Sequence, residues 1–417
     1  MTSDLSAIDE VKENTLSGLR PARVTTYSIS AILLAVGLAL AFSWGFRMVR
    51  AATLMYGMSY TNPPLIIRAY SRAFRHPIVT TDQWIQGRGR PLELRVMAPK
   101  DLPNAPIIVL VHGFASNGIR NGLLNSFGQS LSQSGLKVVM PDIKSEKMLR
   151  IDRAAVADVD DAIRWSAIGS GQKVSVFGIS FSGGMVITAV ANPEYTDYVK
   201  MTFCVSGYNS IERLGRYYLH DDVMGPDGKR YSGTPIQNAL TPMALQYSDE
   251  LVPPNEIEPL SDAMRTMADQ MGFSGSSPTA SLTSNQRVLL NDLINVRTPG
   301  MRARYHALLD RHRAELADIS PMGKIHEVRG SLFVLHGYAD ETIPVGEAEW
   351  TRAEGIHLSN VKVLLTSWVN HCVLVPRASF QDKLQVVHFV SEMLDEALHP
   401  VPLPPANSRV EIKGFSR

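Results

Sequence analysis

The chain has few of the residues that would indicate a metal site, a disulfide framework or a nucleic-acid partner. Only two of its 417 residues are cysteines, Cys204 and Cys372, too few for a disulfide framework or a four-ligand zinc site. Its 41 Lys and Arg residues balance 40 Asp and Glu residues, and no basic run stands out, so we expect no nucleic-acid partner. No phosphate-binding loop or dinucleotide fingerprint occurs, so we also expect no cofactor.

One long stretch near the N-terminus lacks charge altogether. Val24–Phe46 contains no Asp, Glu, Lys or Arg, and about 20 apolar helical residues span the hydrocarbon core of a bilayer. Tyr27 and Trp44 lie near its ends, where amphipathic aromatic residues favour the membrane interface. The sequence therefore predicts a tail over 1–26 and a single transmembrane helix over 27–49.

Two features of this N-terminal region stay open. Ala39-Leu40-Ala41 has the small-x-small form of a signal-peptide cleavage site, although the preceding tail is long and mixed in charge, unlike a short basic n-region. Lys and Arg are nearly equal on the two sides of the apolar stretch, so the sequence leaves the membrane orientation undecided. The connector over 50–78 either lies along the membrane surface or packs on the soluble domain.

The rest of the chain alternates short apolar runs with helical stretches, most clearly at 122–134, 153–168 and 183–191. Such runs are typical of strands buried on both faces of a parallel sheet. Together they predict an α/β fold with a mostly parallel, doubly wound sheet. The predicted strands are Leu92–Met97, Pro106–Val111, Lys137–Met140, Lys173–Phe177, Val199–Val205, Ser331–Leu335 and Val361–Trp368.

This alternation is interrupted over 207–320, a segment rich in Pro, Gly and Ser that contains helical stretches but no convincing buried strand. We therefore expect an insertion between two parts of one α/β core, over 79–206 and 321–400, followed by a tail over 401–417. The last helix of the core is predicted over Phe380–Leu398.

The strand Lys173–Phe177 leads into Gly178-Ile-Ser180-Phe-Ser182-Gly-Gly and then a helix. A strand, a tight turn and a helix present the middle side chain above the sheet edge, provided that the positions two residues away are small. Ser180 fits this nucleophile position because it leaves two turn residues after Phe177. Ser182 is the alternative, since Ser180 precedes it and Gly184 follows it at the same spacing.

With its flanking segments, this turn resembles the α/β-hydrolase family over Gln83–Val205 and Pro321–His399. His112-Gly113-Phe114 is similar to the family's oxyanion loop, and the segment from His336 to Pro344 is similar to its HGxxDxxxP motif. The resemblance implies a catalytic triad of Ser180, Asp340 and His371, in the family's chain order. Glu341 is the alternative acid.

The resemblance also implies the role of each group. His371 would remove the proton of Ser180, Asp340 would orient the imidazole, and the amides of Phe114 and Phe181 would form the oxyanion hole. The insertion over 207–320 would form a cap or lid over the nucleophile.

Three methionines in the insertion share one face of a predicted helix over Pro259–Met271. They are Met264, Met267 and Met271. Methionine suits an adaptable surface for acyl chains, so these residues are candidate substrate contacts. Ordinary core positions are the alternative. If Cys204 and Cys372 follow strands two spacings apart in the family's sheet, they are about 9–10 Å apart, too far for a disulfide, so we expect buried spectator thiols rather than a disulfide or a catalytic thiol.

We therefore expect a membrane-anchored serine hydrolase that cleaves a carboxylic ester with a lipophilic acyl group. Its partners would be that small acyl ester or lipid substrate and the lipid bilayer. The same triad would serve an acyltransferase, a thioesterase or a peptidase. A non-catalytic interaction protein on a hydrolase scaffold is the alternative from another class.

Overall fold

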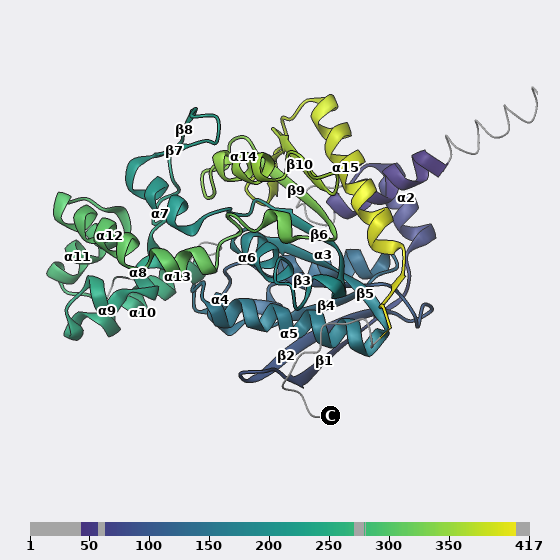
Figure 1. Ribbon diagram of the computed structural model, residues 1–417, viewed down its shortest axis with the longest axis horizontal. Helices are drawn as coiled ribbons and strands as arrows, with labels where there is room; N and C mark the ends of the chain where they lie inside the picture. The colour runs from purple at the N-terminus through teal and green to yellow at the C-terminus, as the bar shows by residue number, and fades with distance from the viewer. Residues whose placement is uncertain (1–42, 57–62, 271–278, 280, 406–417) are drawn as a thin grey trace, which may run out of the picture.

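A nine-stranded, mostly parallel β-sheet forms the centre of the computed structural model, which describes residues 43–56, 63–270, 279 and 281–405 (Figure 1). The strands lie in the order β1-β2-β4-β3-β5-β6-β9-β10, and β13 pairs with β5. Their bounds are β1 Ile78–Gln86, β2 Pro91–Pro99, β3 Ile107–Val111, β4 Lys137–Pro141, β5 Gln172–Ile179, β6 Val199–Val205, β9 Ser331–Gly337, β10 Val361–Thr366 and β13 Val401–Pro402.

The six strands from β4 to β10 pair in parallel, whereas β1 and β2 form an antiparallel edge. Each predicted strand overlaps one of these strands, although Pro106 precedes β3, and β10 ends at Thr366, two residues before the predicted end at Trp368. The predicted α/β fold with a mostly parallel sheet is confirmed. Since parallel strands end at one sheet edge, the loops after β3, β5, β9 and β10 emerge on the same side.

Both faces of this sheet are covered by helices. In β3, Ile107, Val109 and Val111 pack into one buried cluster with α5 and α6, while Ile108 and Leu110 pack into another with α3 and α15. This alternation follows from the two-residue period of a strand. The helices that flank the sheet are α3 Gly122–Gln133, α4 Lys144–Lys147, α5 Arg153–Ser170, α6 Phe181–Val190, α14 Val345–Glu354 and α15 Phe380–Leu398.

The segment between β6 and β9 forms a helical cap at one end of the molecule (Figure 1). The cap has its own apolar core, in which Leu260, Leu293 and Tyr305 are fully buried. Helix α10 begins at Pro254, before the predicted start at Pro259. The elements of the cap are α7 Ile211–His220, β7 Asp222–Met224, β8 Arg230–Ser232, α8 Thr241–Gln246, α9 Ser248–Leu251, α10 Pro254–Gln270, α11 Ser284–Asn295, α12 Pro299–Arg311 and α13 Arg313–Asp318.

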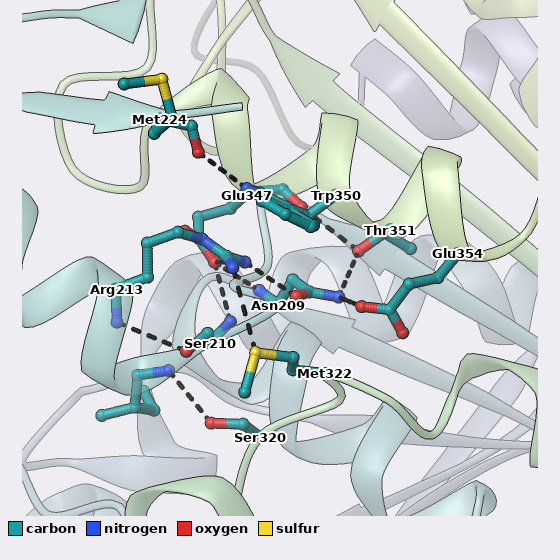
Figure 2. A network of polar contacts seen from close by, with 11 residues as sticks. Asn209, Ser210, Arg213, Met224, Ser320, Met322, Glu347, Trp350, Thr351 and Glu354 are labelled. Atoms are coloured by element: carbon teal, nitrogen blue, oxygen red, sulfur yellow. Dashed lines mark hydrogen bonds and ion pairs between the residues drawn. The ribbon is translucent and has the colours of Figure 1, made fainter. Parts of the chain in front are cut away.

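One buried carboxylate joins the first cap helix to the core (Figure 2). Glu347 of α14 is fully buried and accepts hydrogen bonds from the backbone N–H groups of Asn209 and Ser210, at 2.9 and 2.8 Å. It also accepts one from Nε of Arg213 at 2.6 Å. The Arg213 guanidinium lies 4.7 Å from the ring centre of Trp350. A buried charge is tolerated when it is paired and hydrogen-bonded in this way, so the start of the cap is fixed to α14.

Residues 43–56 form a helix that packs on the α/β core. Ala51, Leu54 and Met55 are buried and belong to the same cluster as Phe203 of β6. Part of the predicted connector over 50–78 therefore contributes to the apolar interior of the α/β core.

Two arginines hold this helix against α15 at the end of the molecule opposite the cap (Figure 1). Arg47 and Arg50 both pair with Asp395, at 3.0 and 2.5 Å. Asp395 lies in the last part of α15, so the N-terminal and C-terminal helices of the unit are joined by charge as well as by apolar contact.

The structure does not test the predicted transmembrane helix. Of the uncharged stretch Val24–Phe46, only residues 43–46 are described. Within the described part of the chain, none of the helices combines the length and apolarity that a membrane crossing needs.

The burial of Leu54 gives a stability prediction. Leu54→Ala should lower the free energy of unfolding by about 2–4 kcal/mol, because it removes a buried side chain and leaves a cavity. Thr53→Ala, at the neighbouring half-buried position, should change it by less than about 1 kcal/mol. Chemical denaturation of both variants checks this, and equal stability of the two would mean that the helix does not pack on the core.

Candidate active site

The chain turns sharply at Ser180, between β5 and α6. Ser180 has φ 61° and ψ −129°, a conformation that a residue with a side chain rarely adopts. Such strain persists only where the surrounding structure imposes it, and it is typical of a strand–turn–helix nucleophile. The turn presents Ser180 at the carboxyl edge of the sheet.

Small residues allow this turn to pack. A Cβ atom on Gly178 would lie 2.6 Å from the backbone oxygen of Ser182. One on Gly183 would lie 2.7 Å from Sγ of Cys204 and 2.9 Å from Cα of Gly207. The sequence predicts the small residue at 178, but only the structure shows why α6 also requires glycine at 183.

Ser182 lies in a different environment from Ser180. Its hydroxyl is fully buried, accepts the N–H of Ile179 at 2.8 Å, and lies 3.1 Å from the carbonyl oxygen of Val111, to which it can donate. Ser182 therefore connects β5 to β3 below the turn, while only Ser180 of the two reaches His371.

The structure brings together the three residues of the expected triad. Nε2 of His371 lies 2.8 Å from Oγ of Ser180, and its Nδ1 lies 3.0 Å from Oδ2 of Asp340. Oδ1 of Asp340 accepts the N–H groups of Thr342 and Ile343, at 2.9 and 2.8 Å. Glu341, the alternative acid, is exposed. Asp340 is thus held by its own loop and aligned on the imidazole.

The charges of the Asp340–His371 pair stabilise each other. Burial raises the pKa of Asp340. The hydrogen bond and charge of His371 lower it by a larger amount, so the pKa of Asp340 lies below its ordinary value. Burial lowers the pKa of His371, while its neighbours Cys372 and Asp340 raise it well above the ordinary value. The site therefore favours the imidazolium that forms when the histidine takes a proton.

Two other histidines support the loops around the site. Nε2 of His112 accepts the N–H of Ile143 at 3.1 Å, which leaves the proton on Nδ1, 2.8 Å from the carbonyl oxygen of Gly113. Nε2 of His336 lies 2.8 Å from the carbonyl oxygen of Ile343, to which it donates. Burial lowers the pKa of both histidines. They fix the loop that carries Phe114 and the loop that carries Asp340.

The two predicted oxyanion-hole residues lie side by side. The rings of Phe114 and Phe181 stack with centres 4.3 Å apart. Phe181 is the first residue of α6, so its N–H has no acceptor within the helix. A Cβ atom on Gly113 would lie 3.4 Å from Cβ of Ser180, which shows how closely the loop approaches the nucleophile.

A cavity of about 380 Å³ opens beside Ser180, between the core and the cap. Among the described residues that line it, none is Asp, Glu, Lys or Arg. Most of the lining is apolar. From the core it includes Phe114, Leu123, Leu124, Phe127, Leu149, Ile179, Phe181 and Cys372, and from the cap Tyr218, Ile236, Ala239, Pro242 and Met267.

The three candidate methionines have different positions. Met267 lines the cavity, whereas Met264 is fully buried in the apolar core of the cap and is not part of the lining. Met271 lies outside the described residues. No sequence signal marks the lining residues from Ile236 to Pro242, because an irregular loop and the first turn of a short helix have no periodicity.

Comparisons with known proteins give only distant similarities. No family model matches the chain, and no curated protein matches it. Among solved structures, acylaminoacyl peptidase of Pyrococcus horikoshii has 12% identity and a TM-score of 0.47, covering 84% of this chain and 45% of its own. This chain therefore spans a little under half of that peptidase.

Two esterases are similar over most of their length. An esterase of Pyrobaculum calidifontis has 15% identity and a TM-score of 0.45, covering 85% of this chain and 94% of its own. Brefeldin A esterase, described as a bacterial homologue of human hormone-sensitive lipase, has 16% identity and a TM-score of 0.46, covering 84% and 86%. Likenesses as distant as these do not define the activity of this chain.

The Asp340–His371 contact gives a pH prediction. A base must be unprotonated, so kcat/KM should rise with pH as His371 loses its proton, on an acid limb displaced upward by the raised pKa. Besides Cys372, Asp340 raises this pKa through its hydrogen bond and negative charge. Asp340→Asn should therefore move the limb part of the way to lower pH, and it should lower the maximal kcat/KM by up to about 10⁴-fold. Glu341→Gln should leave the acid limb at the same pH. If Glu341→Gln moved the limb and Asp340→Asn did not, Glu341 would be the acid of the triad.

Proposed function

We propose that the chain is a serine hydrolase that cleaves carboxylic esters with neutral, apolar acyl groups through an acyl-enzyme on Ser180. The observation that carries this proposal is the row of contacts from Asp340 through His371 to Ser180 at the wall of an apolar cavity. A serine hydroxyl becomes an effective nucleophile when an oriented base lies within hydrogen-bond distance.

The contacts define the path of the protons. Oγ of Ser180 attacks the ester carbonyl and passes its proton to Nε2 of His371, which then donates it to the leaving alcohol. A water molecule repeats the sequence: it gives a proton to His371 and its oxygen to the acyl carbon, and the proton returns to Ser180 as the acid leaves. Asp340 stabilises the imidazolium during both acylation and deacylation.

The negative charge that develops on the carbonyl oxygen needs donors that are already in place. We assign this role to the backbone N–H groups of Phe114 and Phe181, whose stacked rings keep the loop against the first turn of α6. Loss of one oxyanion donor costs about 3–4 kcal/mol in comparable enzymes. Because the cavity is apolar, such interactions are only weakly screened there.

The cavity also supports the choice of substrate class. A charged group in an apolar site is costly unless an opposite charge pairs with it, and the described lining has no carboxylate for the amino terminus of a peptide and no Lys or Arg for a carboxylate. A neutral ester with an aliphatic or aromatic acyl group meets no such penalty.

We further propose that the uncharged stretch Val24–Phe46 anchors the hydrolase in a lipid bilayer. This part of the proposal rests on the sequence, because about 20 uncharged residues match the hydrocarbon thickness. An anchored enzyme would meet lipophilic esters where they concentrate.

The identity of the nucleophile can be tested directly. Ser180→Ala should abolish labelling by a fluorophosphonate probe and hydrolysis of short neutral esters, because among the described residues the Ser180 hydroxyl is the one bonded to Nε2 of His371. Ser182→Ala is the matched control: it should keep the labelling while losing about 1–3 kcal/mol of stability, since the buried N–H of Ile179 loses its acceptor. Labelling of Ser182 in the Ser180→Ala and wild-type chains would overturn the assignment.

The anchor can be tested on the full-length chain. Detergent should be required to extract it from membranes. Carbonate at high pH should not release it, because carbonate disrupts charge pairs and the uncharged stretch would be held by apolar contact with the lipids. The sequence of the mature N-terminus is the control. A soluble chain that lacks its first forty residues would show that the stretch is a cleaved signal peptide.

A further inference from the structure

Helix α2 (Leu65–Phe74) carries an apolar face that the described protein leaves uncovered. Leu65, Ile66 and Phe74 are 77%, 64% and 54% exposed, and Ala69 and Ala73 are exposed between them. At about 100° per residue, Leu65, Ile66, Ala69 and Ala73 fall within about 100° of the helix circumference, and Phe74 lies at the edge of this face, toward Tyr70 and Ile67. Single exposed apolar residues are common on protein surfaces, but a contiguous helical face marks an interaction site.

The side of α2 next to this face contacts the protein. Ile67 is buried, while Tyr70 is half-buried. The ring of Phe46, in the helix over 43–56, lies 5.1 Å from the rings of both Tyr70 and Phe74. Since that helix is itself tied to α15 through Arg47 and Arg50, the apolar face of α2 has a defined direction.

Basic side chains accompany this apolar face. Arg68 and Arg72 lie at its flank, Arg75 follows the helix, and all three are exposed. Within the described residues, no carboxylate pairs with any of the three arginines. An amphipathic helix with an apolar face and unpaired arginines has the composition of helices that lie in the interface of an anionic bilayer.

The position of α2 along the chain points to the same partner. Phe46, which contacts α2, is the last residue of the uncharged stretch Val24–Phe46, and Trp44 beside it is 53% exposed. Aromatic residues gather where a chain enters the lipid headgroups. A second copy of the chain is a poorer occupant, because a stable dimer buries about 800 Å² on each partner and one ten-residue helix offers much less apolar surface.

We propose that α2 lies in the interface of an anionic lipid bilayer, with its apolar face inserted among the lipids and its arginines at the headgroups. This contact is independent of the hydrolase activity. It differs from the anchor because it fixes the orientation of the catalytic unit on the membrane rather than its attachment.

The test places a fluorophore on the apolar face of the full-length chain in vesicles that contain anionic lipid. A polarity-sensitive label on Ala69→Cys should shift to the blue and be quenched by nitroxide-labelled lipids but not by a water-soluble quencher. The matched control is Val288→Cys, a position 72% exposed in the cap, where the opposite pattern is expected. The parent chain, labelled in the same way, gives the contribution of Cys204 and Cys372.

The arginines provide a second readout. Arg68→Gln and Arg72→Gln are each introduced into the labelled Ala69→Cys chain. In anionic vesicles, each should lower the ratio of molecules with α2 in the bilayer to molecules with α2 in water about fivefold, as expected for the loss of one basic residue at such a surface. Arg302→Gln, in the cap, should have no effect.

Three results would overturn the proposal. An Ala69 label accessible to the aqueous quencher would show that α2 stays in water. A label shielded from both quenchers would show that protein covers the face. Shielding that is independent of protein concentration would assign the cover to residues 1–42, and shielding that increases with protein concentration would assign it to a second copy of the chain. Quenching and ester hydrolysis are measured separately, so failure of this proposal is distinct from failure of the proposed activity.

Discussion

The backbone conformation of Ser180 is the constraint on which the active site depends. A residue with a side chain adopts a positive φ only when its surroundings compensate for the strain. Here the compensation comes from the parallel strands on either side of β5 and from glycines that let α6 pack against them. The same turn directs Oγ of Ser180 toward His371 and begins α6 at Phe181, so the proposed nucleophile and the proposed oxyanion donor arise from one local structure.

The other parts of the site are arranged around this fixed point. Asp340 and His371 follow neighbouring strands, and the contact between them is supported by two N–H groups of the Asp340 loop. Glu347, in the helix that follows this loop, also fixes the start of the cap. Cap and triad are therefore tied to the same segment of the core, and the apolar cavity lies between them. Since none of the described residues that line this cavity is Asp, Glu, Lys or Arg, the proposed mechanism relies on the imidazolium and the backbone amides to stabilise the transition state.

Much of this arrangement follows from sequence pattern alone. Continuous apolar runs indicate the parallel strands, and Gly178 with Ser180 indicates the turn, because these signals depend on neighbouring residues. Chain order and family resemblance then select Asp340 and His371. The hydrogen bonds of Ser182 are not predictable in this way, since its partner Val111 is distant in sequence.

The cavity and the N-terminal helix were harder to predict for different physical reasons. The lining from Ile236 to Pro242 consists of an irregular loop and the first turn of α8, whose position depends on the packing of the cap. Ala51, Leu54 and Met55 recur at helical spacing, but they follow an apolar stretch that hides the periodicity. Their role becomes visible only when the opposing surface of the core is known.

The central claim is that Ser180 forms a covalent acyl-enzyme. It is tested most directly by mixing the full-length protein with a neutral ester, quenching in acid within milliseconds and mapping the modified peptide by mass spectrometry. The account predicts a mass increase equal to the acyl group on Ser180 and its disappearance as substrate is consumed. An acyl group on Ser182 or Cys372, or product formation without any acylated residue, would contradict it.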